Sequence, residues 1–334
     1  MNQSGFAFVG ALTVDHIKSI ERLPVRSELV RIHSHISATG GICNSAPDMA
    51  KLDPTVPIHV YGRIGCDADG DLILSTLTQY GIDTSGLLRS GMTSYTDVYE
   101  ERRRNTRTFF HFGGANSHLD VEDVDFSRVT ARYFHAAYPL LLDTLDQPDE
   151  VYGTRMARLL HKAQLHGCLT SLDVVTEQSE RVPRIVLPSL KYTDYLIINE
   201  LEAEAITGIC LTDEHQQLMA SRVPDALGRL KDAGVSRWVV IHAPSGAYGL
   251  DENNHLSHEP GKCLPEGFIR GTVGAGDAFC SGVLLAAYRS LSLDEALRCG
   301  NASAVASLRS ETASGSMETM EQALVQYNAL PYRS

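Results

Sequence analysis

Short apolar runs alternate with amphipathic helical patterns along most of this 334-residue sequence, and this alternation limits the possible folds more than any other feature. The runs predict short buried strands at Phe6–Gly10, His59–Gly62, Tyr133–Ala136, Leu169–Asp173, Tyr195–Ile198 and Trp238–His242. Helical patterns lie between several of them, at Asn44–Leu52, Asp69–Tyr80, Thr154–His166, Asn199–Thr207 and Pro224–Ala233. Strands that alternate with helices form a mostly parallel sheet with right-handed crossovers, so we expect an α/β fold.

Polar residues follow several of these predicted strands. Asp15, Asp173, Asn199 and the Ser245–Gly249 turn each lie at or shortly after the end of one. Ligands of open α/β sheets gather at the carboxyl ends of the strands, so we expect a site there. The last third of the sequence is mostly helical, with patterns at Gly274–Tyr288, Leu293–Leu308 and Met317–Tyr327.

Two segments, 17–38 and about 88–112, alternate polar and apolar residues without a helical period. Such alternation is typical of strands with one exposed face. Both segments follow core elements and return to them, so they could form one small sheet inserted over the site as a lid that excludes water. A pair of plain surface hairpins is the alternative. With these insertions, 1–334 is expected to be a single domain.

The charge balance argues against a nucleic-acid partner. The formal net charge is −12, and the arginine cluster at 102–104 and 107 is local, so no broad basic surface is implied. No run of about 18 apolar residues is present, so no membrane span is expected. The first ten residues lack the basic region of a signal peptide and lead directly into a strand-like run.

The cysteines indicate a reducing compartment. They lie at 43, 66, 168, 210, 263, 280 and 299, without a CxxC pair and with an odd count. This pattern predicts reduced thiols in a cytoplasmic protein rather than a disulfide framework or a zinc site.

The stretch Gly271–Phe279 carries the clearest chemistry. A glycine-rich turn, Gly274-Ala275-Gly276, runs directly into Asp277 and an apolar helical pattern. Exposed backbone N–H groups at a helix start bind anions, phosphates above all. A carboxylate at that place fits phosphoryl transfer, in which it takes the proton of an attacking hydroxyl while the N–H groups neutralise the transferred group. The alternative is a plain helix start with Asp277 as a favourable first-turn residue.

Other motifs occur in an order that resembles the ribokinase-like sugar kinases, the PfkB family. They are Val14-Asp15-His16, the Gly-Gly-x-x-Asn-x-Ala stretch at 40–46, the glycine-rich turn at 62–70, Asn199-Glu200-Leu201-Glu202 and Gly274-Ala275-Gly276-Asp277. The resemblance covers about residues 5–328. It implies a three-layer sandwich around a mostly parallel sheet with a small β-sheet lid, and an enzyme that transfers the γ-phosphate of ATP to a sugar.

The resemblance assigns the sugar to one group of residues. The Asp15 carboxylate would accept two sugar hydroxyls, Gly40 and Gly41 would let the backbone approach the ligand, and Asn44 would offer a donor and an acceptor. Turn and cap roles are the alternatives for these positions. Arg107 could pair with a carboxylate of a sugar acid or lie solvated at the lid edge, and Tyr138 is a further candidate for the pocket.

The resemblance assigns ATP and Mg²⁺ to another group. Asn199 and Glu202 lie on one helical face, where they would contact Mg²⁺ through water; a cap plus an exposed glutamate is the alternative. The expected nucleotide-binding residues are Asn199, Ser245, Gly246, Gly249, Thr272 and Asn301. Asp173 could hold phosphates or metal-bound water, or be purely structural.

One position departs from the family pattern. The C-terminal motif of the family usually begins with an Asp that helps to bind a monovalent cation such as K⁺, whereas this sequence has Gly271 there. A glycine offers only a backbone carbonyl, which weakens the expectation of K⁺ activation.

The expected reaction places Asp277 as the base and the N–H groups of 274–276 as the anion hole, with a primary hydroxyl of a pentose, ketohexose or related sugar as the acceptor. A nucleoside kinase and a catalytically silent sugar- or nucleotide-binding regulator stay as alternatives.

Relatives often dimerise through their lids, so a homodimer is expected. Candidates for sugar selection in or near the lid are Arg104, Arg107, Phe110, His111 and Asn116.

Overall fold

A computed structural model describes residues 3–104, 106–310 and 312–333. Within them the main sheet has nine strands in the order β15-β14-β13-β12-β11-β8-β1-β4-β5. Neighbouring strands from β5 to β13 are parallel, and β14 and β15 are antiparallel additions at one edge. The strands are β1 (Phe6–Gly10), β4 (Ile58–Ile64), β5 (Asp83–Arg89), β8 (Tyr133–Ala137), β11 (Leu169–Leu172), β12 (Tyr195–Asn199), β13 (Trp238–Ala243), β14 (Gly246–Leu250) and β15 (Leu256–Pro260).

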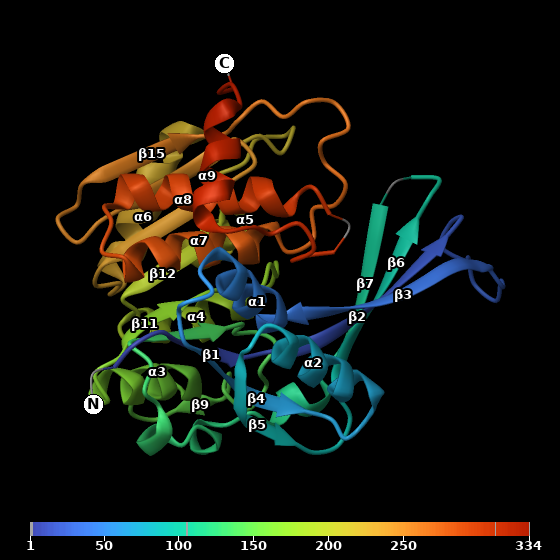
Figure 1. Cartoon of the computed structure of the whole chain (residues 1–334), viewed down its shortest axis with the longest axis horizontal. Helices are drawn as coiled ribbons and strands as arrows, with labels where there is room; N and C mark the ends of the chain where they lie inside the picture. The colour runs from blue at the N-terminus through green and yellow to red at the C-terminus, as the bar shows by residue number, and fades with distance from the viewer. Residues whose placement is uncertain (1–2, 105, 311, 334) are drawn as a thin grey trace.

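The helices form two rows, one on each side of the sheet (Figure 1). In one row α2, α1, α7, α8 and α9 contact one another in that order, and in the other α3, α4, α5 and α6 do so. The expected three-layer α/β sandwich is therefore confirmed. The helices are α1 (Ile42–Leu52), α2 (Ala68–Gln79), α3 (Arg155–Leu165), α4 (Arg181–Leu190), α5 (Glu200–Thr207), α6 (Val223–Asp232), α7 (Ala275–Tyr288), α8 (Leu293–Ser307) and α9 (Met320–Ala329).

A second sheet of four strands, in the order β3-β2-β6-β7, projects from the core as a blade (Figure 1). We call it the lid sheet; it consists of β2 (Leu12–Ile20), β3 (Ile32–Gly41), β6 (Ser94–Glu101) and β7 (Thr106–Phe112). Minor elements complete the chain: the β9–β10 pair (Pro148–Asp149 with Gly153–Thr154) and 3₁₀ turns at Gly114–His118, Val121–Asp123, Phe126–Arg128 and Ala220–Arg222.

The lid sheet differs in extent from the predicted segments 17–38 and 88–112. It starts at Leu12, earlier than predicted. Leu12 and Val14 are both fully buried where β2 leaves the core, so this end of the strand has no exposed face and lacks the pattern that marks the rest of the lid. Leu88 belongs instead to β5, an edge strand of the main sheet whose residues are partly exposed. An edge strand with one exposed face shows the same alternation of polar and apolar residues as a lid strand, so the sequence does not distinguish the two.

Two further elements went unpredicted for physical reasons. The helix α4 contains Pro183 and Pro188, and proline is disfavoured inside helices. The residues after β13 were expected to be a turn up to Gly249, but they form the hairpin strand β14.

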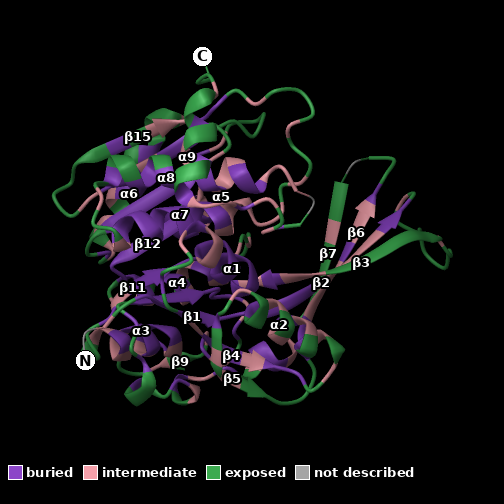
Figure 2. Cartoon of the chain, viewed as in Figure 1, coloured by how far each residue is buried: buried purple, intermediate pink, exposed green. Residues whose placement is uncertain are grey.

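The core fills the space between the sheet and both helix rows. Figure 2 shows the central strands and α7 buried, and the edge strands β3 and β7 of the lid sheet largely exposed. Phe6, Phe8 and Phe134 are fully buried on neighbouring strands. No helix among the described residues combines the length and the apolar composition that crossing a bilayer requires. The apolar interior thus fixes the strand ends, and with them the edge at which polar residues meet.

Candidate active site

Two adjoining cavities lie along the carboxyl ends of β11, β12 and β13, as expected for a parallel sheet. The first, of about 310 Å³, lies under the lid sheet, and the second, of about 390 Å³, extends toward α8 and α9. Both are bordered by Asn199, His242 and Gly276. The first is lined by Thr13, Gly41, Thr96, His111, Tyr138, Leu141, Asp173, Val174, Val175, Thr176, Asn199, Glu202, His242, Gly274, Gly276 and Asp277.

Asp277 stands in the first turn of α7 and faces the first cavity. The Asn44 amide donates to its Oδ2 at 3.0 Å, and the Tyr138 hydroxyl donates to its Oδ1. Burial raises the pKa of Asp277, while these two hydrogen bonds oppose the rise because they stabilise the carboxylate. The carboxylate is thus oriented from both sides and has a strengthened affinity for a proton.

The backbone before Asp277 leaves donors open. Gly274 begins α7 with φ 77°, and no side chain caps the helix. The Ala275 N–H makes only a 3.4 Å contact with the Thr272 carbonyl, and within the described residues the N–H groups of Gly276 and Asp277 meet no acceptor. A helix start with unpaired N–H groups is an anion site. A Cβ on Gly274 would lie 2.4 Å from Ala313 Cβ, so only glycine fits this turn.

The start of α5 faces the same cavity and, unlike that of α7, is closed by a side-chain cap. Asn199 Oδ1 accepts from the Glu202 N–H at 2.9 Å, and Glu202 Oε2 accepts from the Asn199 N–H at 2.9 Å, which is a complete capping box. Thr176 donates to Glu202 Oε1 at 2.7 Å. Burial raises the pKa of Glu202 to about 7 against these hydrogen bonds. The predicted cap is real, but the alternative of an exposed glutamate is wrong, because Glu202 is buried.

Asp173 completes the acidic side of the cavity, just beyond β11. Burial and the nearby Glu202 and Asp277 carboxylates raise the pKa of Asp173 well above its usual range. Behind it lie His135 and Cys280, whose ligand-type atoms and that of Asp173 all fall within 4.8 Å of one another. Burial lowers the pKa of His135 to about 3, which keeps the imidazole neutral. This buried group was not predicted, because its members come from three separate elements.

Asp15 lies on β2, on the lid side of the site. Burial and the Asp277 charge raise its pKa to about 6, and a hydrogen bond from Thr96 opposes the rise. Gly40 lies on the neighbouring strand β3, opposite Thr13, and a Cβ there would come within 3.1 Å of Asp15 Oδ2. Gly41 has φ 69°, and a Cβ there would lie 2.2 Å from the Ala11 carbonyl oxygen. Gly40 therefore keeps the space beside Asp15 free, and Gly41 permits the close approach of the backbone to Ala11.

The candidates for sugar selection on the lid sheet line three different spaces. His111 lines the first cavity and contacts Thr96 Oγ1 through Nδ1 at 3.1 Å. Arg107 pairs with Glu100 at 2.6 Å and lines a different space, between the lid sheet and residues 269–272. Phe110 packs edge-on against Tyr99 on the opposite lid face.

Two more of those candidates lie away from the cavity. Asn116 is fully buried and bonds both backbone groups of Leu12, its Oδ1 accepting from the N–H at 3.2 Å and its Nδ2 donating to the carbonyl at 3.1 Å. Arg104 is highly exposed beside Glu101. The hydrogen bonds and burial of Asn116 give it a structural role, and the exposure of Arg104 makes it a surface residue.

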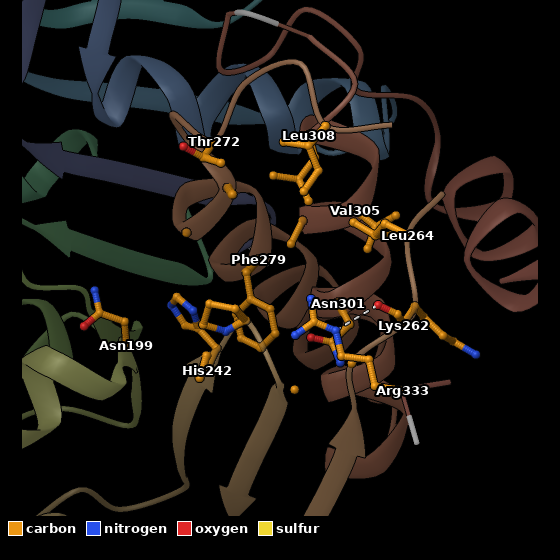
Figure 3. Close-up of a pocket in the computed structure, with 18 of the residues that line it drawn as sticks. Asn199, His242, Lys262, Leu264, Thr272, Phe279, Asn301, Val305, Leu308 and Arg333 are labelled. Atoms are coloured by element: carbon orange, nitrogen blue, oxygen red, sulfur yellow. Dashed lines mark hydrogen bonds between the residues drawn. The ribbon is translucent and has the colours of Figure 1, made fainter. Parts of the chain in front are cut away.

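The second cavity collects only some of the residues expected to bind a nucleotide. Asn199, Gly246, Thr272 and Asn301 line it, and Figure 3 shows Asn301 beside Phe279. Ser245 and Gly249 do not: Ser245 is exposed in the β13–β14 turn, and Gly249 packs against α8, where a Cβ would lie 3.0 Å from Leu293. The apolar part of the lining consists of Leu264, Ile269, Phe279, Val305 and Leu308.

Three residues that sequence reasoning missed also border the site. Thr96 and Thr176 contact Asp15 and Glu202, respectively. His242, at the end of β13, packs on the Phe279 ring at 4.6 Å and approaches Gly276. For His242 its place at a strand end was the available signal, but the two threonines lie in no motif.

Comparison with known proteins gives a consistent family. Residues 5–320 match the pfkB family of carbohydrate kinases. A ribokinase from Haemophilus influenzae is 26% identical over 324 residues, which cover 95% of this chain and 96% of that protein. An Arabidopsis thaliana ribokinase is 26% identical over 306 residues, which cover 89% of this chain and 74% of that protein.

Solved structures share the fold. Arabidopsis thaliana ribokinase complexed with ribose and ATP has a TM-score of 0.78 at 22% identity, over 98% of this chain and 99% of that one. A nucleoside kinase from Methanocaldococcus jannaschii has a TM-score of 0.75 at 17% identity, over 98% and 99%. With the family match along nearly the whole chain, the protein belongs to the pfkB carbohydrate kinases and is a phosphotransferase with an alcohol group as acceptor.

Proposed function

We propose that this enzyme transfers the γ-phosphoryl group of ATP to a primary hydroxyl of a neutral pentose or ketohexose. The observation that carries the proposal is Asp277, a half-buried carboxylate held by Asn44 and Tyr138 directly beside the uncapped N–H groups of a helix start. Phosphoryl transfer depends on this combination of a base and fixed positive dipoles. The ribokinase relatives support the sugar and ATP as substrates.

Asp277 would take the proton of the attacking hydroxyl while the oxygen bonds to the γ-phosphorus and ADP leaves. Its raised pKa favours this step, because a base must hold the proton it accepts. The backbone N–H groups of 274–276 would stabilise the charge of the transferred group. Asp15 and Asn44 would orient the sugar, and the space that Gly40 leaves beside Asp15 has room for its hydroxyls.

Mg²⁺ fits the acidic side of the cavity. Asp173 and Glu202 offer carboxylate oxygens there, and Mg²⁺ binds such oxygens through its own water molecules. When bound, the ion would neutralise charge on the nucleotide phosphates. The capping box holds Glu202 in place for this contact. A monovalent cation at Gly271 stays unsupported, since that residue supplies no side-chain ligand.

The lining of the first cavity favours a neutral sugar over a sugar acid. It contains no Arg or Lys side chain among the described residues, and Arg107 is engaged by Glu100 outside it. Of the residues that the structure describes in that lining, the aromatic ones are His111, Tyr138 and His242. A nucleoside would require a broader stacking platform for its base, so the neutral sugar is preferred.

A screen of ADP release with Mg·ATP tests this function. The panel contains ribose, fructose, tagatose, 2-keto-3-deoxygluconate and several nucleosides, and the Asp277→Asn variant is the control. We expect a neutral sugar to release ADP with the wild-type enzyme only. Activity with 2-keto-3-deoxygluconate or a nucleoside alone would overturn the substrate assignment, and an equally active Asp277→Asn enzyme would overturn the assignment of the base.

We also propose a homodimer through the lid sheet. Its outer face carries an apolar hollow lined by Ile20, Leu23, Pro24, Glu28, Leu29, Val30, Ile32, Asp97, Tyr99 and Phe110. Leu29 is 91% exposed and Phe110 58% exposed, and covering such side chains is favourable. Light scattering on the purified protein tests this: a monomeric mass across the micromolar range would refute it.

A further inference from the structure

The segment Leu330–Arg333 lies beside residues 261–263 as a short strap. The Cys263 N–H donates to the Pro331 carbonyl at 2.8 Å, and the Arg333 N–H donates to the Gly261 carbonyl at 2.9 Å. Between these bonds, Lys262 and Tyr332 form an antiparallel bridge, and the Lys262 ammonium lies 3.2 Å from the centre of the Tyr332 ring. Backbone bonds and a cation–π contact therefore fix the strap next to the second cavity.

The strap places Arg333 in the lining of that cavity. The Arg333 Nε donates to the Lys262 carbonyl at 3.3 Å, and the side chain lines the second cavity. Figure 3 shows Arg333 next to Asn301 at one end of the cavity, with Asn199 at the other end. Asn199 and Gly276 also border the first cavity, so the Asn199 end is the one adjacent to Asp277.

The two ends of the second cavity therefore differ: one lies next to Asp277, and the other is formed by Asn301 and Arg333. If ATP is the donor, as proposed above, its phosphates lie at the Asn199 end and its base at the Arg333 end. The base end is apolar on its walls, through Leu264 and Val305, and polar at its edge. The Asn301 amide group already donates to the Glu259 carbonyl at 3.3 Å and to the Tyr327 hydroxyl at 3.4 Å, which leaves its Oδ1 as the acceptor.

We propose that Arg333 binds the base of the nucleotide and is a determinant of nucleotide affinity. A guanidinium has only donors, and the ring nitrogens of a purine are acceptors, so the two are complementary. Asn301 Oδ1 supplies the complementary acceptor for an exocyclic amino group. The inference rests on the proposed use of ATP and extends it, because neither Arg333 nor the strap belongs to any motif of the sequence.

Calorimetric titration with Mg·ADP and with Mg·tripolyphosphate tests the inference on the full chain. A hydrogen bond from a charged group contributes about 1.5–3 kcal/mol, so Arg333→Ala should raise the Kd of ADP by about tenfold or more. The Kd of tripolyphosphate, which has no base, should stay unchanged. In the kinase assay, KM for ATP should rise by the same factor, while kcat and the sugar KM stay the same.

Two further variants separate binding from folding of the strap. Arg333→Lys keeps the charge and should recover part of the ADP affinity, whereas Arg333→Gln should not. Thermal unfolding of each variant is measured alongside, and we expect it to match the wild type because Arg333 is exposed.

Each other outcome has a definite meaning. An unchanged ADP Kd in Arg333→Ala overturns the inference and leaves the kinase proposal intact. Equal losses for ADP and tripolyphosphate place Arg333 on the phosphates and also overturn it. A wild-type enzyme that binds no ADP at all would refute the proposed function itself, and the inference with it.

Discussion

Two helix starts, those of α5 and α7, face the same cavity, and they are built in opposite ways. At α5, Asn199 and Glu202 satisfy each other's backbone groups, with Thr176 as an additional donor. At α7, Gly274 offers no cap, and the N–H groups of Gly276 and Asp277 have no acceptor among the described residues. Both starts carry a carboxylate, buried at Glu202 and half-buried at Asp277, but only the α5 start has a side-chain cap.

The difference shows that a helix start is no anion site by itself. A closed start is stable without a ligand and serves to hold a carboxylate in place, as α5 does for Glu202. An open start leaves backbone donors unsatisfied, which a phosphoryl group can compensate. We therefore propose that the transferred group binds at the start of α7 and the hydrated metal ion near Glu202 of α5.

The largest effect is expected at the open start. Asp277→Asn keeps the shape of the side chain but removes the base, so kcat should fall by at least about 10²–10³-fold. ADP affinity should change little, because the N–H groups remain. Steady-state kinetics and calorimetry measure the two effects, and a well-folded variant with wild-type kcat would refute the role of Asp277.

Gly274→Ala should damage the same start sterically. The new Cβ would lie 2.4 Å from Ala313 Cβ at a backbone φ of 77°, so the turn must shift. We expect a loss of about 1–3 kcal/mol in the free energy of unfolding and a clear loss of kcat. The matched control is Gly208→Ala, at the end of α5, where φ is 71° but no atom lies within 4 Å of the added Cβ. Equal effects of the two variants on unfolding and kcat would contradict this account.

The closed start is tested through Asn199→Ala. Loss of the cap should cost about 1 kcal/mol of unfolding free energy, because the Glu202 N–H loses its acceptor. If the cap positions Glu202 for the metal ion, the Mg²⁺ concentration for half-maximal activity should rise several-fold. A variant that is destabilised but has unchanged Mg²⁺ dependence would restrict α5 to a structural role.

The raised pKa of Glu202 leads us to expect that the stability of the protein depends on pH. Its pKa is raised from 4.5 to about 7 in the folded protein, so the folded state binds a proton more tightly than the unfolded state. Its stabilising contribution is present below pH 4.5 and is lost as the pH rises to about 7. The wild type should therefore lose stability relative to Glu202→Gln over that window. Denaturant unfolding at several pH values measures the difference, and a constant difference would contradict the raised pKa.

Local motifs predicted the parts of the site that lie close together in sequence. The Gly-x-Gly-Asp turn and the three-residue spacing of Asn199 and Glu202 were sufficient to place the two helix starts at the strand ends. Contacts between distant residues could not be predicted this way. Thr176 reaches Glu202 across 26 positions, and no periodicity encodes such a contact.

Residues that share a motif can also have different roles. Ser245 and Gly249 belong to the turn assigned to ATP, yet Gly249 packs on Leu293, because an antiparallel strand turns successive residues to opposite faces. The same alternation directs Phe110 to the outer lid face while His111 faces the cavity. The sequence alone does not give the strand register, so it cannot show which of two neighbouring residues faces the cavity.

The smallest effect is expected from Arg107, which the sequence offered as a ligand for a sugar acid. Arg107 is paired with Glu100 and lines the space beside residues 269–272, outside the lining of the first cavity. Such a partly exposed pair contributes little, so Arg107→Ala should change kcat and the sugar KM by less than about threefold. Kinetics with the sugar found in the screen measure this. A tenfold rise in sugar KM would mean that the lid sheet brings Arg107 to the substrate on closing, and the contrast between α5 and α7 would then describe only the open enzyme.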